Sequence, residues 1–314
     1  MVTNKLDRPE KIGNVLLNYK FYNGTDQYSD GEIEEELLKI VQENEDYCEI
    51  ISHRVNWPIM YHLSKERENI VSWIEFKKNS EILEIGAGCG AITGCLCEKA
   101  KSVTAVELSK RRSLINAYKN KKYNNLEIIV GNFETVYQNL QKKYDYITLI
   151  GVLEYAPLYV QGAKPFETLL KNANHLLNTN GEIIIAIENR FGLKYFAGCK
   201  EDHLGKPFIG IEGYDCGRTK VQTFNKKELI QLFKNAGFLS WDFFYPYPDY
   251  KFPECIYSDV YLPQKGELVN NERNFDSNRL RLFDETKAFD TIIDSEYFTD
   301  FSNSFLIRIK KKED

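Results

Sequence analysis

A glycine-rich turn and the acid before it have the residue types and spacing of a site for a charged ligand. The segment EILEIGAGCGAITG, residues 81–94, contains Gly86, Gly88 and Gly90 at alternate positions. Glycines allow backbone angles that are closed to other residues, and they let a ligand approach the main chain closely. Glu84 precedes the turn inside an apolar stretch, where an acid suits a ligand with a cation and repels a pyrophosphate.

A second acid follows 21 positions after Gly86. Glu107 ends the apolar segment KSVTAV, residues 101–106. An acid about 20 residues beyond a glycine turn typically accepts hydrogen bonds from ribose hydroxyls. Free N–H groups at the start of the helix after the turn can receive a polar ligand group. These features together predict a site for a ribose-containing ligand that carries a cation.

The hydrophobic pattern predicts the frame that holds these residues. Seven strands are expected, at residues 81–85, 102–106, 126–130, 145–150, 181–187, 238–244 and 304–309. Helices are expected at about 91–99, 110–120, 134–141, 165–178 and 225–236. Apolar strands that alternate with amphipathic helices are typical of a parallel sheet covered on both faces. We therefore predict an α/β fold, a Rossmann-like, doubly wound, mostly parallel seven-stranded sheet with an antiparallel last strand and ligands at the carboxyl ends of its strands.

The chain is expected to divide into two parts. Residues 1–78 are predicted to form an N-terminal arm and helical cap, and residues 79–314 the main domain. Two insertions, at about 189–222 and 245–300, are rich in aromatic side chains and are predicted to lie on the substrate side. The second insertion is expected to be mostly irregular.

Within the N-terminal part, three segments differ in character. Residues 1–31 are polar and punctuated by glycine, as in a weakly ordered arm or irregular cap. Residues 32–43 have apolar side chains at helical spacing, which predicts an amphipathic helix. Residues 57–63 are rich in aromatic and histidine side chains, and they either fold over the glycine turn or pack on the core.

The composition argues against several classes of function. The chain has 314 residues, of which 43% are hydrophobic and 28% charged, as in a globular protein with a sizeable core. Its net charge of −5 and pI near 5.6 argue against a nucleic-acid partner, which favours a basic face. The polar start lacks the apolar core of a signal peptide, and no apolar run approaches the ~20 residues that span a bilayer, so no membrane insertion is expected. Seven cysteines without the spacing of secreted domains favour a cytoplasmic location.

Six segments, each at its expected place in the alternation of strands and helices, together resemble one enzyme family. They are LEIGAGCG at 83–90, VTAVELS at 103–109, GNFE at 131–134, YDYITLIGVLEY at 144–155, LLNTNGEIIIAIEN at 176–189 and FNKKELIQLFKNAGF at 224–238. The chain resembles the class I S-adenosylmethionine (SAM)-dependent methyltransferases over residues 66–244 and the last strand. HLSKERENI, ENRFGLKYFAGCKEDH, GIEGYD and FSNSFL are similar, more loosely, to segments of bacterial methyltransferases found beside glycosyltransferases of surface-saccharide assembly or fused to them.

The resemblance implies SAM as the cofactor and a part in binding it for nine residues. They are Glu84, Gly86, Ala87, Gly88, Glu107, Leu108, Asn132, Phe133 and Gly151. Glu84 and the glycine turn would border the methionine end, and Glu107 would bind both ribose hydroxyls. Leu108 would pack on the adenine, with Asn132 at its amino edge and Phe133 near the ring. The backbone of Gly151 would face the amino group of the cofactor. Asn132 replaces the usual Asp of the family, and an amide oxygen can accept the same hydrogen bond.

The expected reaction is methyl transfer to a small molecule or a glycan intermediate, at an oxygen or a nitrogen. For a hydroxyl acceptor, a general base would speed the transfer about 10²–10⁴-fold. The candidates on pocket-facing segments are Glu154, His203, Glu212 and Asp215. Methylation of a base amine is disfavoured, because the fourth strand ends in GVLEYAP and not in the Asn/Asp-Pro-Pro-aromatic run of those enzymes.

Two alternative functions stay open at this point. A nicotinamide dinucleotide site fits the glycine pattern that ends in alanine, although Glu84 would repel its pyrophosphate. A non-catalytic SAM-binding module of a saccharide-assembly complex fits the same motifs without turnover. No metal site is expected, because Cys199, His203 and Cys216 match no standard zinc spacing. The sequence carries no signal for the oligomeric state.

Overall fold

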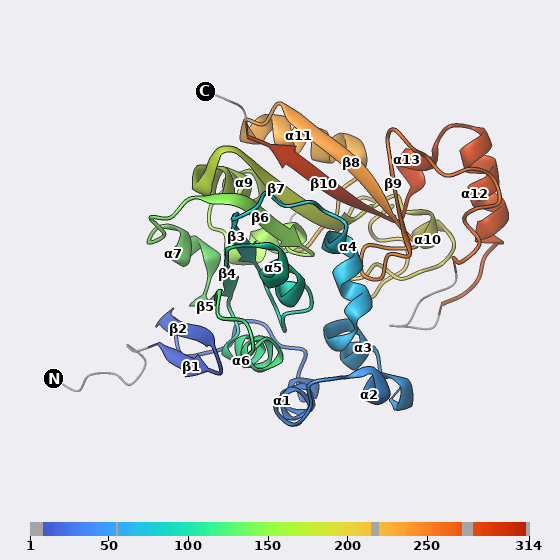
Figure 1. Cartoon of the computed structure of the whole chain (residues 1–314). Helices are drawn as coiled ribbons and strands as arrows, with labels where there is room; N and C mark the ends of the chain where they lie inside the picture. The colour runs from blue at the N-terminus through green and yellow to red at the C-terminus, as the bar shows by residue number, and fades with distance from the viewer. Residues whose placement is uncertain (1–8, 55, 215–219, 272–278, 312–314) are drawn as a thin grey trace. The chain divides into compact units, whose positions relative to one another are not determined.

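The structure is a computed structural model that describes residues 9–54, 56–214, 220–271 and 279–311. Its residues group into two compact units, whose elements are labelled in Figure 1. The first unit comprises Met1–Leu149 and Leu176–Gly181, and the second comprises Ile150–His175 and Glu182–Asp314. Asp215 and Cys216, which the sequence analysis singled out, lie outside the described residues.

The first unit is built on a mostly parallel sheet. Across the sheet, its strands are β1 (Glu10–Ile12), β2 (Val15–Phe21), β5 (Leu126–Gly131), β4 (Ser102–Glu107), β3 (Glu81–Ile85) and β6 (Tyr144–Ile150). The first two strands pair antiparallel, and every later pair in this order is parallel. The four strands predicted between residues 81 and 150 are confirmed, and so is their parallel arrangement.

Helices of the first unit pack against this sheet and against one another (Figure 1). They are α1 (Ile33–Glu43), α2 (Cys48–His53), α3 (Trp57–Leu63), the 3₁₀ turn η1 (Lys65–Glu68), α4 (Asn69–Ser72), α5 (Thr93–Lys99), α6 (Lys110–Lys119) and α7 (Phe133–Tyr137). The predicted amphipathic helix at 32–43 is confirmed as α1. Its apolar face, with Leu37 and Val41, packs in one buried cluster with Ile59 of α3, Cys89 and Ile115 of α6. The N-terminal helices therefore share a core with the glycine turn.

The prediction of a weakly ordered or irregular segment at residues 1–31 is wrong for the part that forms β1 and β2. Val15, Leu17 and Tyr19 are buried on alternate positions of β2, which is the period of a strand with one face on a core. Gly13 has a φ of +58° and makes the tight turn between the two strands. The glycines of this segment were taken as a sign of irregularity, and the alternation between them was missed.

The second unit contains an antiparallel set of strands. In order they are β7 (Leu177–Glu188), β10 (Ser304–Lys310), β8 (Ser240–Tyr247) and β9 (Cys255–Ser258). Ile307 of β10 lies opposite Ile185 of β7 and Phe243 of β8, and both pairings are antiparallel. The prediction of an antiparallel last strand is confirmed. The described residues hold the seven predicted strands and three further ones, β1, β2 and β9.

Helices of the second unit are mostly short. They are η2 (Leu153–Tyr155), α8 (Ala156–Tyr159), α9 (Pro165–Leu176), α10 (Leu193–Phe196), α11 (Lys226–Ala236), α12 (Glu285–Asp294) and α13 (Phe298–Phe301). The predicted caps of α11 are confirmed: Asn225 and Glu228 form a capping box, and Gly237 ends the helix with a φ of +94°.

The second insertion is more ordered than predicted. Residues 245–300 include β9, α12 and α13, because aromatic side chains give this segment a core of its own. Phe298 lies with its ring 5.6 Å from that of Tyr245 and 6.2 Å from that of Phe289, and all three side chains are buried. Among the described residues, no helix combines the length and apolar character that crossing a bilayer requires.

Candidate functional site

The glycine turn joins the end of β3 to the start of α5 in the first unit. Gly86, Gly88 and Gly90 have φ values of +71°, +53° and +78°, in the region that favours glycine. The N–H groups of Gly86 and Ala87 donate to the carbonyl of Val106 on β4 at 2.8 and 3.2 Å. A Cβ on Gly88 would meet only the Arg112 guanidinium within 4 Å, at 3.7 Å, so there is open space beside this turn.

A chain of buried polar side chains lies behind the turn. Thr93 Oγ1 donates to Glu84 Oε2 at 2.7 Å, and Asn116 Nδ2 donates to Thr93 Oγ1 at 3.1 Å. Asn120 Nδ2 in turn donates to Asn116 Oδ1 at 2.8 Å. A Cβ on Gly90 would lie 2.4 Å from Asn116 Oδ1, so only glycine lets this chain pass beneath the turn. Thr93 and Asn116 were not singled out from the sequence, where nothing distinguishes them from other helix residues.

Glu84 is a buried acid in this chain, 3% exposed. Burial raises its pKa to about 8, an effect that the Thr93 hydrogen bond reduces and the charge of Glu107 reinforces. Among the described residues it forms no ion pair. A cationic ligand group near Glu84 would supply the missing positive charge, as the sequence analysis expected.

Glu107 ends β4 and is 4% exposed. Its Oε2 accepts the N–H of Gly88 and its Oε1 that of Ser109, both at 2.8 Å. A carboxylate offers about four lone-pair sites, so capacity remains for hydroxyl donors after these two bonds. Burial raises the pKa of Glu107, against the charge of Arg112 and the backbone hydrogen bonds. The acid is thus held in a fixed orientation at the rim of the sheet, where a ribose was predicted.

The other predicted cofactor residues of the first unit follow the ends of β4 and β5. Leu108 is partly exposed directly after Glu107. Asn132 is the N-cap of α7, where its Oδ1 accepts the N–H of Glu134 at 2.9 Å. Phe133 is buried, with its ring 6.1 Å from that of Tyr137. One lone pair of the Asn132 oxygen therefore serves the helix, and its predicted bond to adenine would use the other.

Arg112 is a further residue of this region that the sequence analysis missed. It pairs with Asp30 at 2.6 Å and with Glu34 at 3.1 Å, and its guanidinium stacks over the Tyr28 ring at 4.5 Å. His62 contacts the same Asp30 carboxylate at 3.0 Å. These contacts join α1 and the segment before it to α6, beside the glycine turn. In the sequence, Arg112 is one of three basic residues in a row at the start of α6, and nothing there predicts its contacts with Asp30 and Glu34.

In the second unit, Gly151 follows directly after β6. Its φ is +67°, and its N–H donates to the carbonyl of Ala186 on β7 at 2.9 Å. A Cβ at this position would lie 2.8 Å from the hydroxyl of Tyr250. Close packing and backbone conformation both require glycine here, and its predicted contact with the cofactor remains a prediction.

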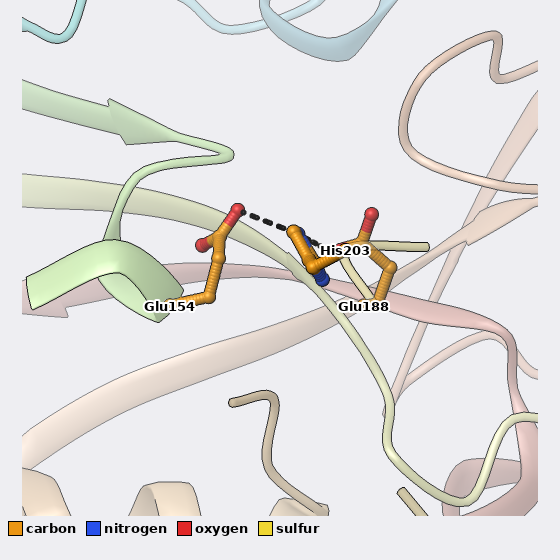
Figure 2. Close-up of side chains that lie close together, drawn as sticks. All are labelled: Glu154, Glu188 and His203. Carbon is orange, nitrogen blue, oxygen red and sulfur yellow. Dashed lines mark ion pairs between the residues drawn. The ribbon is translucent and has the colours of Figure 1, made fainter. Parts of the chain in front are cut away.

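Glu154 and His203, two of the predicted catalytic residues, are brought together with Glu188 in the second unit. The Nε2 atom of His203 lies 3.5 Å from Glu154 Oε1 and 3.8 Å from Glu188 Oε2. Figure 2 shows the Glu154 carboxyl group turned toward the His203 ring. Glu154 is 1% exposed and Glu188 fully buried. No hydrogen bond from the described residues reaches the Glu154 carboxylate, whereas Glu188 forms an ion pair with Lys251. Glu188 ends an apolar strand as Glu107 does, and that signal could have identified it.

The charges of this cluster shift its pKa values. Burial opposes a charge on His203, but Glu188, Glu154 and Glu201 outweigh it and hold the pKa of His203 well above its usual value. Burial raises the pKa of Glu154, and the nearby Glu188 raises it further, while His203 lowers it. The Glu201 carboxylate accepts a hydrogen bond from His203 Nδ1 at 3.0 Å. It also accepts hydrogen bonds from the backbone N–H groups of His203 and Leu204, at 2.9 and 2.7 Å.

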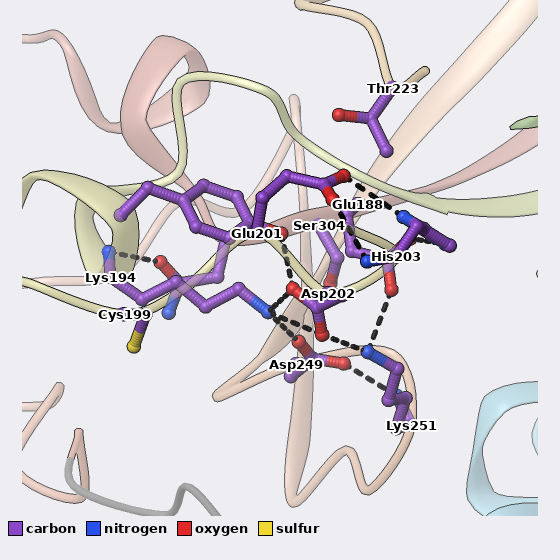
Figure 3. A network of polar contacts seen from close by, with 12 residues as sticks. Glu188, Lys194, Cys199, Glu201, Asp202, His203, Thr223, Asp249, Lys251 and Ser304 are labelled. Atoms are coloured by element: carbon purple, nitrogen blue, oxygen red, sulfur yellow. Dashed lines mark hydrogen bonds and ion pairs between the residues drawn. The ribbon is translucent and has the colours of Figure 1, made fainter. Parts of the chain in front are cut away.

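A wider ionic network continues from this cluster (Figure 3). Lys251 pairs with Glu188 at 2.7 Å and also contacts Asp202. Lys194 pairs with Asp202 at 3.1 Å and with Asp249 at 2.7 Å. By contrast, the predicted candidate Glu212 has an exposed side chain and is not part of the network.

The chain is similar to several known proteins and matches one family model. The family model described as a methyltransferase domain matches residues 61–240. The chain is 35% identical over 98 residues to the ribosomal RNA small subunit methyltransferase A of Borreliella afzelii, which covers 31% of this chain and 35% of that protein. The protein of the same name from Mycoplasma mycoides is 26% identical over 210 residues, 66% of this chain and 68% of that protein. A SAM-dependent methyltransferase from Archaeoglobus fulgidus is a structural neighbour with a TM-score of 0.49 and 14% identity, over 80% of this chain and 96% of that chain.

The first of these curated relatives matches this chain over about a third of its own length. The family model, in contrast, covers more than half of the chain, from α3 to the start of β8. The residues of the first unit also fit SAM, because Glu107 has acceptor capacity for ribose hydroxyls and Glu84 is a buried acid without an ion pair. The chain therefore belongs to the methyltransferase-domain family.

Proposed function

We propose that the enzyme transfers the methyl group of SAM to an oxygen or nitrogen of a small molecule or a glycan intermediate. The observation that carries this proposal is the buried cluster of Glu154, Glu188 and His203. Glu154 follows the last residue of β6 by only four positions. A buried acidic cluster suits a hydroxyl or amine acceptor, whereas it repels the phosphates of a nucleic acid.

In this proposal the residues of the first unit bind the cofactor. Glu107 binds the ribose hydroxyls, Glu84 compensates the positive charge, and Asn132 and Phe133 hold the adenine. The bound cofactor supplies an activated methyl group, so the protein need not supply a nucleophile. The task of the chain is to align the acceptor with the methyl group and to exclude water.

We assign the removal of the acceptor proton to Glu154 and the positioning of its carboxylate to His203. A carboxylate with a raised pKa is a stronger base, so Glu154 is suited to take the proton of an acceptor hydroxyl. His203 keeps that carboxylate in place by an ion pair at 3.5 Å. Glu212 is a weaker candidate because its side chain is exposed, and Asp215 lies outside the described residues.

The association with surface-saccharide assembly is part of the same proposal. It is supported by the similarity of ENRFGLKYFAGCKEDH and GIEGYD to bacterial methyltransferases of that setting. The first of these segments contains Glu188, Glu201, Asp202 and His203, and thus most of the acidic cluster.

The test is methyl transfer from radiolabelled SAM to fractionated metabolites and glycans of a bacterial extract. We expect label in one such fraction, and a turnover at least about 100-fold lower for Glu154→Gln with unchanged SAM affinity. Equal turnover in this variant would remove Glu154 from the mechanism.

A second candidate acceptor is ribosomal RNA, because the curated relatives are named for methylation of the small-subunit RNA. The net charge of −5 and the GVLEYAP run after β6 disfavour it. Purified small-subunit RNA therefore belongs in the same assay. Label in the RNA and in no metabolite or glycan fraction would replace the first proposal by this one.

A further inference from the structure

The cluster of Glu154, Glu188 and His203 has a ligand geometry that ion pairing alone does not explain. One atom from each side chain lies within 4.8 Å of the others. Both contacts of His203 Nε2 with the carboxylates, at 3.5 and 3.8 Å, are longer than a good N–H···O hydrogen bond. A tetrahedral ion with bonds of about 2.0–2.2 Å separates its ligand atoms by about 3.3–3.6 Å. The 3.5 Å contact lies in this range and the 3.8 Å contact is slightly longer, so modest side-chain movements would bring all three groups onto one ion.

The carboxylate of Glu154 is the buried group of this cluster that is least satisfied. Both carboxylate oxygens of Glu154, which is 1% exposed, receive no hydrogen bond from the described residues. A buried carboxylate without hydrogen bonds is costly, and a metal ion is one of the few groups that compensates it. Figure 2 shows this carboxylate turned toward the His203 ring.

The charge balance of the surrounding network also calls for a cation. The network contains five carboxylates, those of Glu154, Glu188, Glu201, Asp202 and Asp249, and two ammonium groups, those of Lys194 and Lys251. A proton on His203 would compensate one of the three excess negative charges, and a divalent ion would compensate two.

Two of the proposed ligands, His203 and Glu188, are each held by a further polar contact, as ligands at metal sites usually are. His203 Nδ1 contacts Glu201 Oε1 at 3.0 Å, and Glu201 also accepts the hydroxyl of Tyr214 at 3.1 Å. A carboxylate on the far nitrogen of a histidine fixes the tautomer and the ring direction for metal binding. Lys251 holds the other oxygen of Glu188 at 2.7 Å, so that ligand is oriented as well.

We propose that Glu154, Glu188 and His203 bind one divalent first-row transition ion, with Zn²⁺ as the reference ion. Two carboxylate oxygens and one imidazole nitrogen are a ligand set that such ions accept, and three protein ligands leave a fourth position open. With the ion bound, these side chains act on an acceptor through the open position. The site stands on its own geometry and does not depend on which acceptor the enzyme uses.

The experiment measures metal content without any acceptor, so its outcome is separate from that of the methyl-transfer assay. The full chain is stripped with a chelator, dialysed against Zn²⁺ and analysed by atomic emission. We expect one Zn²⁺ per chain, at most a tenth of that in Glu154→Gln and His203→Gln, and unchanged content in His53→Gln, whose histidine is exposed. Glu201→Gln should retain the ion with about 10–100-fold weaker affinity.

Co²⁺ substitution of the wild-type chain tests the ligand set without a variant. A tetrahedral nitrogen and oxygen site gives a strong visible band and no near-ultraviolet thiolate band, which separates it from the seven cysteines of the chain. Absence of a stoichiometric ion, equal Zn²⁺ in His203→Gln with native circular dichroism, or a thiolate band would each overturn the proposal.

Discussion

Cofactor binding should release a proton from Glu84. The pKa of this buried carboxyl is about 8 in the cofactor-free chain, so at pH 7 about nine-tenths of the molecules carry the proton. If the positive charge of SAM binds beside Glu84, as proposed, it favours the ionised form and lowers this pKa. A bound-state pKa of about 6 or below makes the release about 0.8 proton or more per SAM at pH 7.

The sign of the pH dependence follows from this release. A ligand whose binding expels a proton binds more tightly as pH rises, because fewer protons compete. Between the bound-state pKa and the free-state value of about 8, the affinity for SAM should therefore rise by up to about tenfold per pH unit. Above pH 8 the rise should level off, since Glu84 is then ionised in the free chain as well.

Titration calorimetry in two buffers of different ionisation enthalpy measures the released protons directly. Glu84→Gln is the matched variant, because the amide oxygen can still accept the Thr93 hydroxyl but the group does not ionise. The difference between wild type and variant removes the titration of the cofactor itself. Equal proton release by the two proteins, or an affinity difference that is flat from pH 6 to 8, would refute the placement of a cation beside Glu84.

Three further substitutions test the glycine turns and the ribose acid. Glu107→Gln should weaken SAM binding by about 10–150-fold in calorimetry. In the variant the side-chain NH₂ group would face the N–H of Gly88 or Ser109, both of which the wild-type carboxylate accepts. Unchanged affinity would remove Glu107 from the site. An alanine in the left-handed conformation costs roughly 1–2 kcal/mol, and Gly90→Ala adds to this a Cβ clash at 2.4 Å. Gly24 has a φ of +96° and open space around it, so Gly90→Ala should lower the free energy of unfolding by more than the control Gly24→Ala. Gly151→Ala, with a φ of +67° and a contact at 2.8 Å, should also lower the thermal midpoint by more than Gly24→Ala; equal midpoints would contradict the close packing.

The glycine turn and the acid at the end of β4 could be placed from the sequence because their signals are local. Gly86 to Gly90 and Glu107 mark the ends of two apolar strands, and strand ends in a parallel sheet meet at one edge. The alternation that placed β3 to β6 is equally local. Spacing therefore singled out the glycine turn and Glu107, and the family resemblance supplied the other predicted cofactor residues. Neither pointed to Arg112. Its partners Asp30 and Glu34 are about 80 positions away in the sequence, and no spacing rule joins them.

The acidic cluster of the second unit was found only in part for the same reason. Glu154 and His203 were candidates one by one, but 49 positions separate them. Glu188 follows the predicted strand at 181–187 and was not singled out. The β1–β2 hairpin and the helices of residues 285–301 depend on contacts with distant segments. β2 pairs with β5, more than 100 positions away, and Phe298 packs on Tyr245. Local propensity does not report such pairings.

One physical feature joins the two sites, although each unit holds its own. Glu84 in the first unit and Glu154 in the second are at most 3% exposed, and burial raises the pKa of both carboxyl groups. A carboxylate in such a place destabilises the free chain, and structural acids of this protein avoid that state by pairing, as Glu34 does with Arg112 at 3.1 Å. At Glu84 and Glu154 a cation from outside the chain would stabilise the ionised form of the acid. By this argument a sulfonium and a divalent metal ion meet the same need at different places, and Glu84→Gln and Glu154→Gln should each weaken only the binding of its own cation.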